Sequence, residues 1–537
     1  MREQGRTKQR IIKNLGRKEH VEANGDLDRL ARSAARLAQR SMILSLLDQD
    51  GVPTLATRRI GPPLAFERLW RETGCRAVDL AAERSFGFAL ERACFLTVLH
   101  RLMVSGSDRA ADAWREDYRI EGTEELALHH LYRTMGWLGE EFPVAEQPGR
   151  TPFAPRCVKD VVEERLFEAR RDLFSELSVV FMDTTSLYFE GAGGETLGRR
   201  GHSKDHRPDL MQMIVAVVMD QQGRPLCCEM WPGNTTDVTV LLPVVDRLGQ
   251  RFGITRVCVV ADRGMISAQT IAALEVRGLE YILGVRERTA KEVHTLVLDD
   301  DAPFVPLVIP RQGRPDTELE AKAVTLGKRR YIVCRNRAEA EKDAAEREAI
   351  VANLRQALRR GDKALVGNAG YRRFLKPPEV GFAIDEARVA EDARFDGIFV
   401  LRTNTTLDPL QAMLRYRELQ GVEQLFRSAK SLLATRPIFH KRDATIRGHV
   451  FCSFLALVLK ELADRCAARG FQPEWAEVLR DLDRFQEVAV EQDGKRFILR
   501  TPTTGCAGKL FQTLGVALPP NIRDANPSVT AADSPQP

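Results

Sequence analysis

Two aspartates follow directly on apolar runs that are typical of buried strands. Asp183 ends the run VVFMD, and Asp262 ends the run VCVVAD. A carboxylate at the carboxyl end of a buried strand lies at the sheet edge where α/β proteins bind ligands. Two such groups on neighbouring strands repel each other unless a cation lies between them, and oxygen ligands suit Mg²⁺ or Mn²⁺. The pattern indicates a divalent-metal site, although each aspartate could instead cap the turn that follows it.

A third carboxylate lies in a segment with helical spacing, residues 408–433. Tyr416, Glu423 and Lys430 are seven residues apart and therefore share one face of a helix. The adjacent apolar stripe, which would pack on a sheet, comprises Val422, Phe426, Ala429 and Leu433. Glu423 then lies at the border of the buried face, where it could join the two aspartates, and Lys430 could hold a phosphate beside a metal. An ordinary amphipathic helix would show the same periodicity.

The elements that must position these residues are strands and helices in mixed order. Four apolar runs predict strands, and they are LSVVFMD, QMIVAVVMD, VCVVAD and YILGVR. Helical stretches lie between the later ones, TVLLPVVDRLGQRF and SAQTIAALEVRG. Strands that first follow one another and then alternate with helices predict an α/β fold, a mixed sheet covered by helices.

Charge is distributed unevenly along the 537 residues. The net charge of +5 comes from 80 basic and 75 acidic residues. Residues 1–20 and residues 415–449 each have a net charge of +5, so the rest of the chain is net acidic by 5. Two basic segments indicate a polyanionic partner, although a solvated tail explains the first one equally well.

Several classes of protein are excluded by composition. No apolar run approaches the roughly 18 residues of a membrane-spanning helix, so we expect no membrane association. The polar start MREQGRTKQRIIKN does not resemble a signal peptide, which predicts a cytoplasmic protein. The ten cysteines form no C-x-x-C pair, so neither a zinc cluster nor a disulfide framework is indicated.

The order of these motifs resembles insertion-sequence DDE transposases of the cut-and-paste type. Their signature Y-x2-R-x3-E-x6-K is matched by Tyr416, Glu423 and Lys430, whereas Leu419 stands at the arginine position, for which Arg417 or Arg415 could compensate. Similar blocks surround the signature, namely FMDTTSLYFEG, GHSKDHRPDLMQMIVAVVMD, VVADRGM and SLLATRPIFHKRDATIRGHVFCSFLAL. The resemblance covers roughly residues 175–290 and 400–465.

The resemblance implies an RNase H-like mixed α/β core and a defined chemistry. Asp183, Asp262 and Glu423 would be the catalytic carboxylates and would bind two Mg²⁺ ions, with Mn²⁺ as the alternative. The expected activity is cleavage at transposon ends followed by strand transfer into target DNA. The partners would be double-stranded DNA, as terminal inverted repeats and as target, and a second subunit in a homodimeric synaptic complex associated with the nucleoid.

We expect basic residues near these carboxylates to contact the DNA backbone. The candidates are Tyr416, Arg417, Arg427, Lys430, Lys441, Arg442, Arg447, Lys204 and Arg207. Five regions are predicted: a helical, DNA-binding region at 1–165, core segments at 170–290 and 406–470, a β-rich insertion subdomain at 291–405, and a C-terminal region with a disordered tail at 471–537.

Two alternatives remain open at this stage. An RNase H-fold nuclease would share the carboxylates but would not transfer strands. A non-catalytic DNA-binding protein derived from a transposase would bind DNA alone, and the presence of all three carboxylates argues against it.

Overall fold

The computed structural model describes most of the chain. The described residues are 2–3, 6–7, 54–80, 84–147, 155–170, 179–254, 258–285, 293, 298–309, 316–327, 329–359, 373–376, 383–492 and 495–524. Most of the basic segment 1–20, and most of the Pro- and Gly-containing stretch 146–155, lie outside them. The chain divides into two compact units, one formed by residues 1–65, 116–120 and 466–537 and the other by residues 66–115 and 121–465. No described helix is long and apolar enough to cross a membrane.

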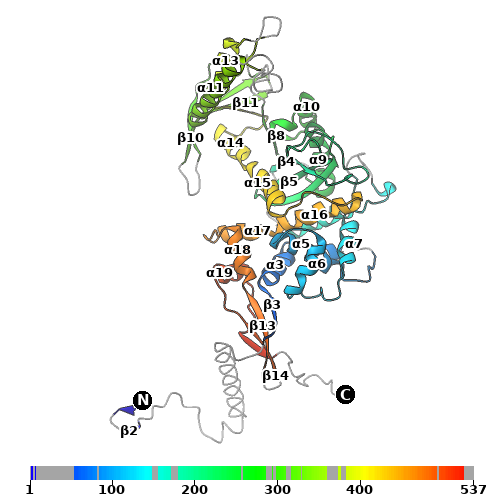
Figure 1. Cartoon of the computed structure of the whole chain (residues 1–537). Coiled ribbons are helices and arrows are strands. Elements are labelled where there is room, and N and C mark those ends of the chain that lie inside the picture. Colours follow the sequence, from blue (N-terminus) through cyan, green and yellow to red (C-terminus); the bar gives the residue numbers. More distant parts are fainter. Residues whose placement is uncertain are drawn as a thin grey trace. The chain divides into compact units, whose positions relative to one another are not determined.

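A nine-stranded sheet organises the larger unit (Figure 1). Its strands are β4 (Val179–Tyr188), β5 (Gln212–Asp220), β6 (Pro225–Pro232), β7 (Cys258–Ala261), β8 (Glu280–Gly284), β9 (Val305–Ile309), β10 (Thr317–Leu326), β11 (Arg329–Arg335) and β12 (Ile398–Thr403). Their order across the sheet is β6-β5-β4-β7-β8-β12-β11-β10-β9. Strands β4, β5 and β6 are antiparallel neighbours, whereas β4, β7 and β8 run parallel. This arrangement of the first five strands confirms the predicted RNase H-like mixed α/β fold.

The strands predicted as an insertion extend the same sheet. β12 pairs with β8, and β11, β10 and β9 follow it as antiparallel neighbours. Two helices accompany them, α11 (Arg337–Arg359) and α13 (Glu386–Ala393). The sequence predicted a β-rich insertion subdomain at 291–405. The structure instead joins these strands to the core edge, because the exposed edge of β8 offers backbone groups that β12 satisfies.

Different helices cover the two faces of the core sheet. Helices α9 (Asp237–Phe252) and α10 (Ala268–Val276) pack on one face, where Val180 and Met182 of β4 belong to the same buried cluster. Because side chains alternate along a strand, Phe181 and Asp183 point to the opposite face. Helices α14 (Pro409–Glu418) and α15 (Gln420–Arg427) contain no residue of that cluster, and they contact β4, β5, β7 and β8.

Helices α5 (Leu90–Met103) and α7 (Leu128–Leu138) pack against α16 (Asp443–Leu459), which is almost wholly buried. The other helices of these parts of the chain are α3 (Gly61–Glu72), α4 (Ala77–Leu80), α6 (Asp108–Trp114), α8 (Val158–Arg170) and α17 (Glu461–Ala467), with short helical turns at Arg115–Asp117 and Val144–Glu146. Glycines allow α7 and α16 to approach closely, since a Cβ on Gly139 would lie 1.9 Å from the Ala444 carbonyl oxygen and one on Gly448 would lie 1.9 Å from that of Met135.

The smaller unit corrects two predictions. Its sheet has the order β15-β14-β13-β3 and consists of β3 (Thr54–Arg59), β13 (Gln486–Gln492), β14 (Lys495–Arg500) and β15 (Ile522–Asp524). Helices α18 (Trp475–Asp483) and α19 (Ala507–Leu514) accompany it, and Arg2–Glu3 pairs with Arg6–Thr7. The region 1–165 is therefore not purely helical, because β3 pairs with β13. The predicted disordered tail does not include Ile522–Asp524, because this strand pairs with β14, and residues 525–537 lie outside the described residues.

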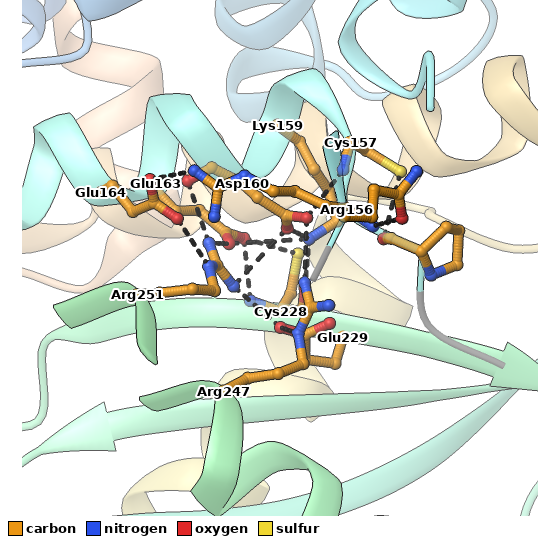
Figure 2. A network of polar contacts seen from close by, with 12 residues as sticks. Arg156, Cys157, Lys159, Asp160, Glu163, Glu164, Cys228, Glu229, Arg247 and Arg251 are labelled. Carbon is orange, nitrogen blue, oxygen red and sulfur yellow. Dashed lines mark hydrogen bonds and ion pairs between the residues drawn. The ribbon is translucent and has the colours of Figure 1, made fainter. Parts of the chain in front are cut away.

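A buried network of charges attaches α8 to the sheet and to α9 (Figure 2). Three cations and three anions are almost fully buried, and they are Lys159, Arg247, Arg251, Asp160, Glu163 and Glu229. Lys159 Nζ lies 2.6 Å from Asp160 Oδ1, and Arg251 Nη1 lies 2.8 Å from Glu229 Oε1. Burial alone would raise the pKa of Asp160, but Arg251, Lys159 and Arg247 lower it below its usual value. Each buried charge therefore has opposite charges beside it.

Candidate active site

The two predicted catalytic aspartates come from adjacent parallel strands. The β4–β7 ladder ends at the pair Met182 and Ala261, so Asp183 and Asp262 occupy the next position on each strand. The prediction that Asp183 ends its strand is wrong, because β4 continues to Tyr188 and stays paired with β5. What ends at Asp183 is the pairing with β7. Neighbouring strands are about 4.8 Å apart, so the two aspartate backbones start side by side.

Neither aspartate acts as a turn cap. The Asp183 carboxylate accepts a hydrogen bond from the next backbone N–H, that of Thr184, at 2.7 Å within the strand. Asp262 precedes a short helical turn, Arg263–Met265, but its side chain makes no capping bond there. The turn is closed instead by the backbone, because Met265 N–H donates to the Asp262 carbonyl oxygen. Neither side chain therefore caps the turn that follows it, which was the alternative to a metal site.

Glu423 is carried by α15, the helix that packs on β4 and β5. Val422 and Phe426 are buried beneath it, while Glu423 itself is exposed. The predicted continuous helix is interrupted: α14 ends at Glu418, α15 begins at Gln420, and a wider π-helical turn occupies Ser428–Leu432. Helical spacing alone therefore does not describe how Tyr416, Glu423 and Lys430 are related.

Tyr416 acts on the second aspartate. Its hydroxyl donates a hydrogen bond to Asp262 Oδ1 at 3.2 Å. Gly284, the last residue of β8, makes room for this contact, because a Cβ there would lie 2.4 Å from the tyrosine oxygen. Burial raises the pKa of Tyr416, and the negative charge of Asp262 raises it further, so the hydroxyl stays protonated as a donor. Tyr416 was predicted to contact DNA, and the structure gives it a different partner.

A cavity of about 280 Å³ joins Asp262 and Glu423. Tyr416, Arg417 and Leu419 also border it. Leu419, which stands at the arginine position of the signature, is buried, and Arg417 brings a guanidinium to the same cavity. The apolar part of the wall comes partly from the inserted strands and consists of Ile309, Leu319, Phe399 and Met413.

The electrostatics of Asp183 reflect its burial and its charged neighbours. Its pKa is raised to about 6: burial raises it most, the charges of Asp262 and Glu423 also raise it, and Lys204 lowers it. This effect indicates that all three carboxylates act on one another. A cation held among them would relieve both the burial of Asp183 and the mutual repulsion.

Lys204 lies beside Asp183 but is bound elsewhere. Its ammonium donates to the Thr184 carbonyl oxygen at 2.8 Å and to Thr184 Oγ1 at 2.7 Å, and it pairs with Asp237 Oδ2 at 3.0 Å. These three contacts use all three of its protons. Lys204 is therefore a fixed charge of the site and does not support the predicted DNA contact. The sequence analysis missed this arrangement, whose one signal is Asp237 at the end of the run GNTTD, residues 233–237.

Lys430 is also neutralised within the chain. Its ammonium lies 2.8 Å from Asp205 Oδ1, and Arg436 Nη1 lies 3.3 Å from Asp205 Oδ2. The Asp205 side chain is only 5% exposed. Burial lowers the pKa of Lys430, although Asp205 opposes this effect. Asp205 follows Lys204, so one loop fixes charges beside β4 and beside the Glu423 helix.

The other predicted DNA contacts fall into two groups. Arg207, Arg427, Lys441 and Arg442 are exposed, and Arg207 pairs with Asp209 at 2.9 Å. Arg447 is 6% exposed and its Nη1 lies 2.7 Å from Glu141 Oε1. The prediction for Arg447 is wrong, because its position on the buried face of α16 leaves it to an ion pair with the neighbouring helical layer.

The residues of the site suit a metal ion by the chemistry of their donor atoms, but the described side chains are not arranged around one. Among the described residues, no group of three or more His, Cys, Asp or Glu side chains is arranged to hold a metal ion. The donors nevertheless suit a hard divalent ion, since all three are carboxylates and Asp183 and Asp262 are register neighbours. The residues present therefore fit such an ion in chemical type and in order along the sheet.

The sheet is RNase H-like, and two carboxylates follow the point where the pairing of its parallel strands β4 and β7 ends. Together these features are typical of enzymes that cut or join nucleic-acid strands. The family described as "Transposase DDE domain" matches residues 174–459, more than half of the chain, and the chain belongs to this family. Residues 1–49 match a second family, described as "IS1634 family transposase, N-terminal domain". The protein is thus an insertion-sequence DDE transposase, an enzyme that cleaves and joins DNA, and such enzymes generally depend on divalent metal ions.

Comparison with solved structures finds seven similar chains, among them the following one. It comes from the cryo-EM structure of a piggyBac transposase synaptic complex with hairpin DNA. The TM-score is 0.39 and the sequence identity is 12%, over 78% of this chain and 79% of that one. No curated protein matches the chain.

Proposed function

We propose that this transposase cleaves the ends of its own element and joins the freed 3′ ends to target DNA, with Asp183, Asp262 and Glu423 as its catalytic carboxylates. One observation carries the proposal. Asp183 and Asp262 follow the last register pair of two adjacent parallel strands, and Glu423 borders the same cavity as Asp262. The raised pKa of Asp183 adds support, because burial and both other carboxylates contribute to it.

The carboxylates would hold two Mg²⁺ ions, with Mn²⁺ as an alternative. Divalent ions bound there would supply activation of the attacking oxygen and stabilisation of the leaving oxygen. The residues of the chain orient this site: the Tyr416 hydroxyl holds Asp262, and the Lys204 ammonium is fixed beside Asp183. No side-chain nucleophile is required, so serine and cysteine need no catalytic role.

The substrate would be double-stranded DNA, as terminal inverted repeats and as target. The exposed residues Arg207, Arg427, Lys441 and Arg442 would hold backbone phosphates. The region 1–165 would recognise the repeats, and two subunits would pair two ends in a homodimeric synaptic complex. This work on the chromosome would place the protein in the cytoplasm, at the nucleoid.

The test uses DNA that flanks the gene. Purified full-length protein is incubated with a duplex ending in the candidate inverted repeat, with Mg²⁺ or Mn²⁺, and then as a pre-cut end with a target plasmid. We expect nicking at the end and joined product. Asp183→Ala, Asp262→Ala and Glu423→Ala should each abolish cleavage but retain DNA binding, whereas Asp246→Ala, an exposed aspartate on α9, should cleave normally.

Each outcome decides a part of the proposal. Cleavage by any of the three alanine variants would refute the assignment of that residue. Cleavage without joined product would favour a nuclease of the same fold. Binding by the wild type without cleavage, under both metals, would favour a non-catalytic DNA-binding protein.

A further inference from the structure

A second cavity shares no lining residue with the cavity of Asp262 and Glu423, and its arginines come from two segments that are far apart in the sequence. It has a volume of about 500 Å³. Arg84 and Arg133 come from the helical region around α7, and Arg442 directly precedes α16. α7 and α16 pack side by side (Figure 1). Sequence reasoning found only Arg442, because the partners lie some 300 positions earlier in the chain.

Aromatic rings hold two of these guanidinium groups. Arg84 lies 5.1 Å from the ring centroid of Phe86, and Arg133 lies 5.1 Å from that of Phe88. Phe86 packs edge-on against Trp137, which lines the cavity, with 5.5 Å between ring centroids. Guanidinium groups stacked on rings keep their edges available for planar hydrogen bonding. The arginines are thus positioned before any ligand arrives.

The charge around the cavity is only partly neutralised. Glu140 is its one acidic lining residue, and it pairs with Arg84 at 2.6 Å. Among the described residues, neither Arg133 nor Arg442 has an ion-pair partner. Asp443, the acidic residue of the first turn of α16, faces away, because its carboxylate accepts the backbone N–H groups of Glu195 and Thr196. An excess of positive charge therefore remains at the cavity.

Exposed aromatic side chains neighbour the lining arginines in the sequence, since Tyr132 precedes Arg133 and Phe439 lies three positions before Arg442. Phe439 is 67% exposed and Tyr132 is 38% exposed, although both are large and apolar. Tyr132 packs edge-on against His440, with 6.2 Å between ring centroids, which brings α7 beside the segment that carries Lys441. Exposed rings interleaved with cations suit a ligand that offers both phosphates and sugar or base faces.

We propose that this cavity is a phosphate-binding site that holds the backbone of the DNA substrate, with Arg133 and Arg442 as its principal ligands and Arg84 in support. Guanidinium groups match a phosphate in a bidentate geometry. The site links the helical layer to the segment after the Glu423 helix, so one DNA strand would contact both parts. This inference rests on the proposed function, because it takes DNA as the ligand.

The experiment measures DNA affinity as a function of salt. Full-length wild type and the double variant Arg133→Ala/Arg442→Ala are titrated by fluorescence anisotropy with a terminal-repeat duplex and with an unrelated duplex of equal length. Loss of one phosphate contact should reduce the slope of log K against log salt by about one, and affinity about fivefold at 0.15 M salt. Both duplexes should weaken equally, because phosphates carry no sequence information.

Matched variants separate the site from general charge and from folding. Arg337→Ala/Arg355→Ala removes two exposed arginines from α11 and should leave affinity and slope unchanged. Arg133→Gln/Arg442→Gln removes both charges with a smaller loss of side-chain volume and should show the same reduced salt slope, which decides the question if the alanine variant does not fold. An unchanged slope in the alanine variant, or an equal loss in the α11 control, would overturn the proposal.

Two further measurements, phosphate binding and DNA cleavage, test this proposal separately from the proposed transposase function. Binding of inorganic phosphate alone at micromolar concentration, lost in the alanine variant, would assign the cavity to a free anion and overturn the DNA assignment. If the wild type cleaves DNA and the alanine variant binds DNA with an unchanged salt slope, the phosphate site is refuted and the transposase function stands. If the alanine variant has a reduced salt slope and the wild type does not cleave, the phosphate site stands and the transposase function is refuted.

Discussion

Replacement of Asp183 by asparagine tests the electrostatics of the site without substrate. The carboxyl is buried, and its pKa is raised to about 6, first by burial and then by Asp262 and Glu423. A rise of roughly two units above the usual value corresponds to about 3 kcal/mol against the ionised form. Asparagine has the same shape, no charge, and can still accept the Thr184 N–H. We expect Asp183→Asn to be inactive in cleavage and yet more stable, by up to about 3 kcal/mol, at pH 7.5 in EDTA.

The stability difference between Asp183→Asn and the wild type should depend on pH. Above pH 6 Asp183 of the wild type is ionised in the folded and in the unfolded state, and the burial of the charge lowers the free energy of unfolding. Below about pH 4 the carboxyl is protonated in both states, so this loss of stability disappears. The advantage of Asp183→Asn in thermal denaturation should therefore shrink between pH 6 and pH 4. Asp246→Asn is the control and should follow the wild type, and Mg²⁺ should stabilise the wild type more than Asp183→Asn. A variant with the same or lower melting temperature at every pH would refute this reasoning.

Three further predictions concern residues other than the three carboxylates. Asp160→Asn should cost roughly 3 kcal/mol, because it removes a buried anion that Lys159, Arg247 and Arg251 share. The wild type should lose this stability as pH falls, since the pKa of Asp160 is lowered, and equal melting temperatures would contradict this. Asp205→Asn should lower the melting temperature and the cleavage rate at saturating DNA, and Lys430→Met should reproduce both effects if the pair acts as a unit. Gly448→Ala should destabilise strongly, because its Cβ would meet a carbonyl of α7 at 1.9 Å. Gly249→Ala should be tolerated, because its Cβ would lie 3.6 Å from the Ile254 carbonyl oxygen, and similar melting temperatures for the two variants would refute the close packing.

Periodicity located the strands and the Glu423 helix, but it misplaced an end of each. The apolar run stops at Asp183, whereas β4 continues through Thr184, Thr185 and Ser186, all buried. Hydropathy fails there because the side chains are polar, although threonine favours extended backbone. The break at Leu419 is hidden for the opposite reason, because an apolar residue continues the helical pattern through it.

The partners of the basic residues could not be predicted from the sequence. Lys430 is neutralised by Asp205, 225 positions away, and Arg447 by Glu141, which lies in the helical region. The net charge of +5 in residues 415–449 counts both as available for DNA. Folding removes them from that count, and it adds Arg84 and Arg133, which lie in no basic run. Charge along the sequence indicated a polyanion but not the surface that meets it.

Two buried aspartates show what distinguishes a structural site from a catalytic one in this chain. Burial acts on Asp160 and on Asp183 in the same direction, yet the pKa of Asp160 is lowered and that of Asp183 is raised. The difference is the charge around them. Asp160 belongs to a network with a cation for every anion, whereas Lys204, the cation near Asp183, is bound to Asp237. The network of Figure 2 pairs its charges within the chain, whereas the carboxylates at the sheet edge repel one another, and a bound cation would relieve that repulsion. That repulsion is the physical reason for expecting metal ions there.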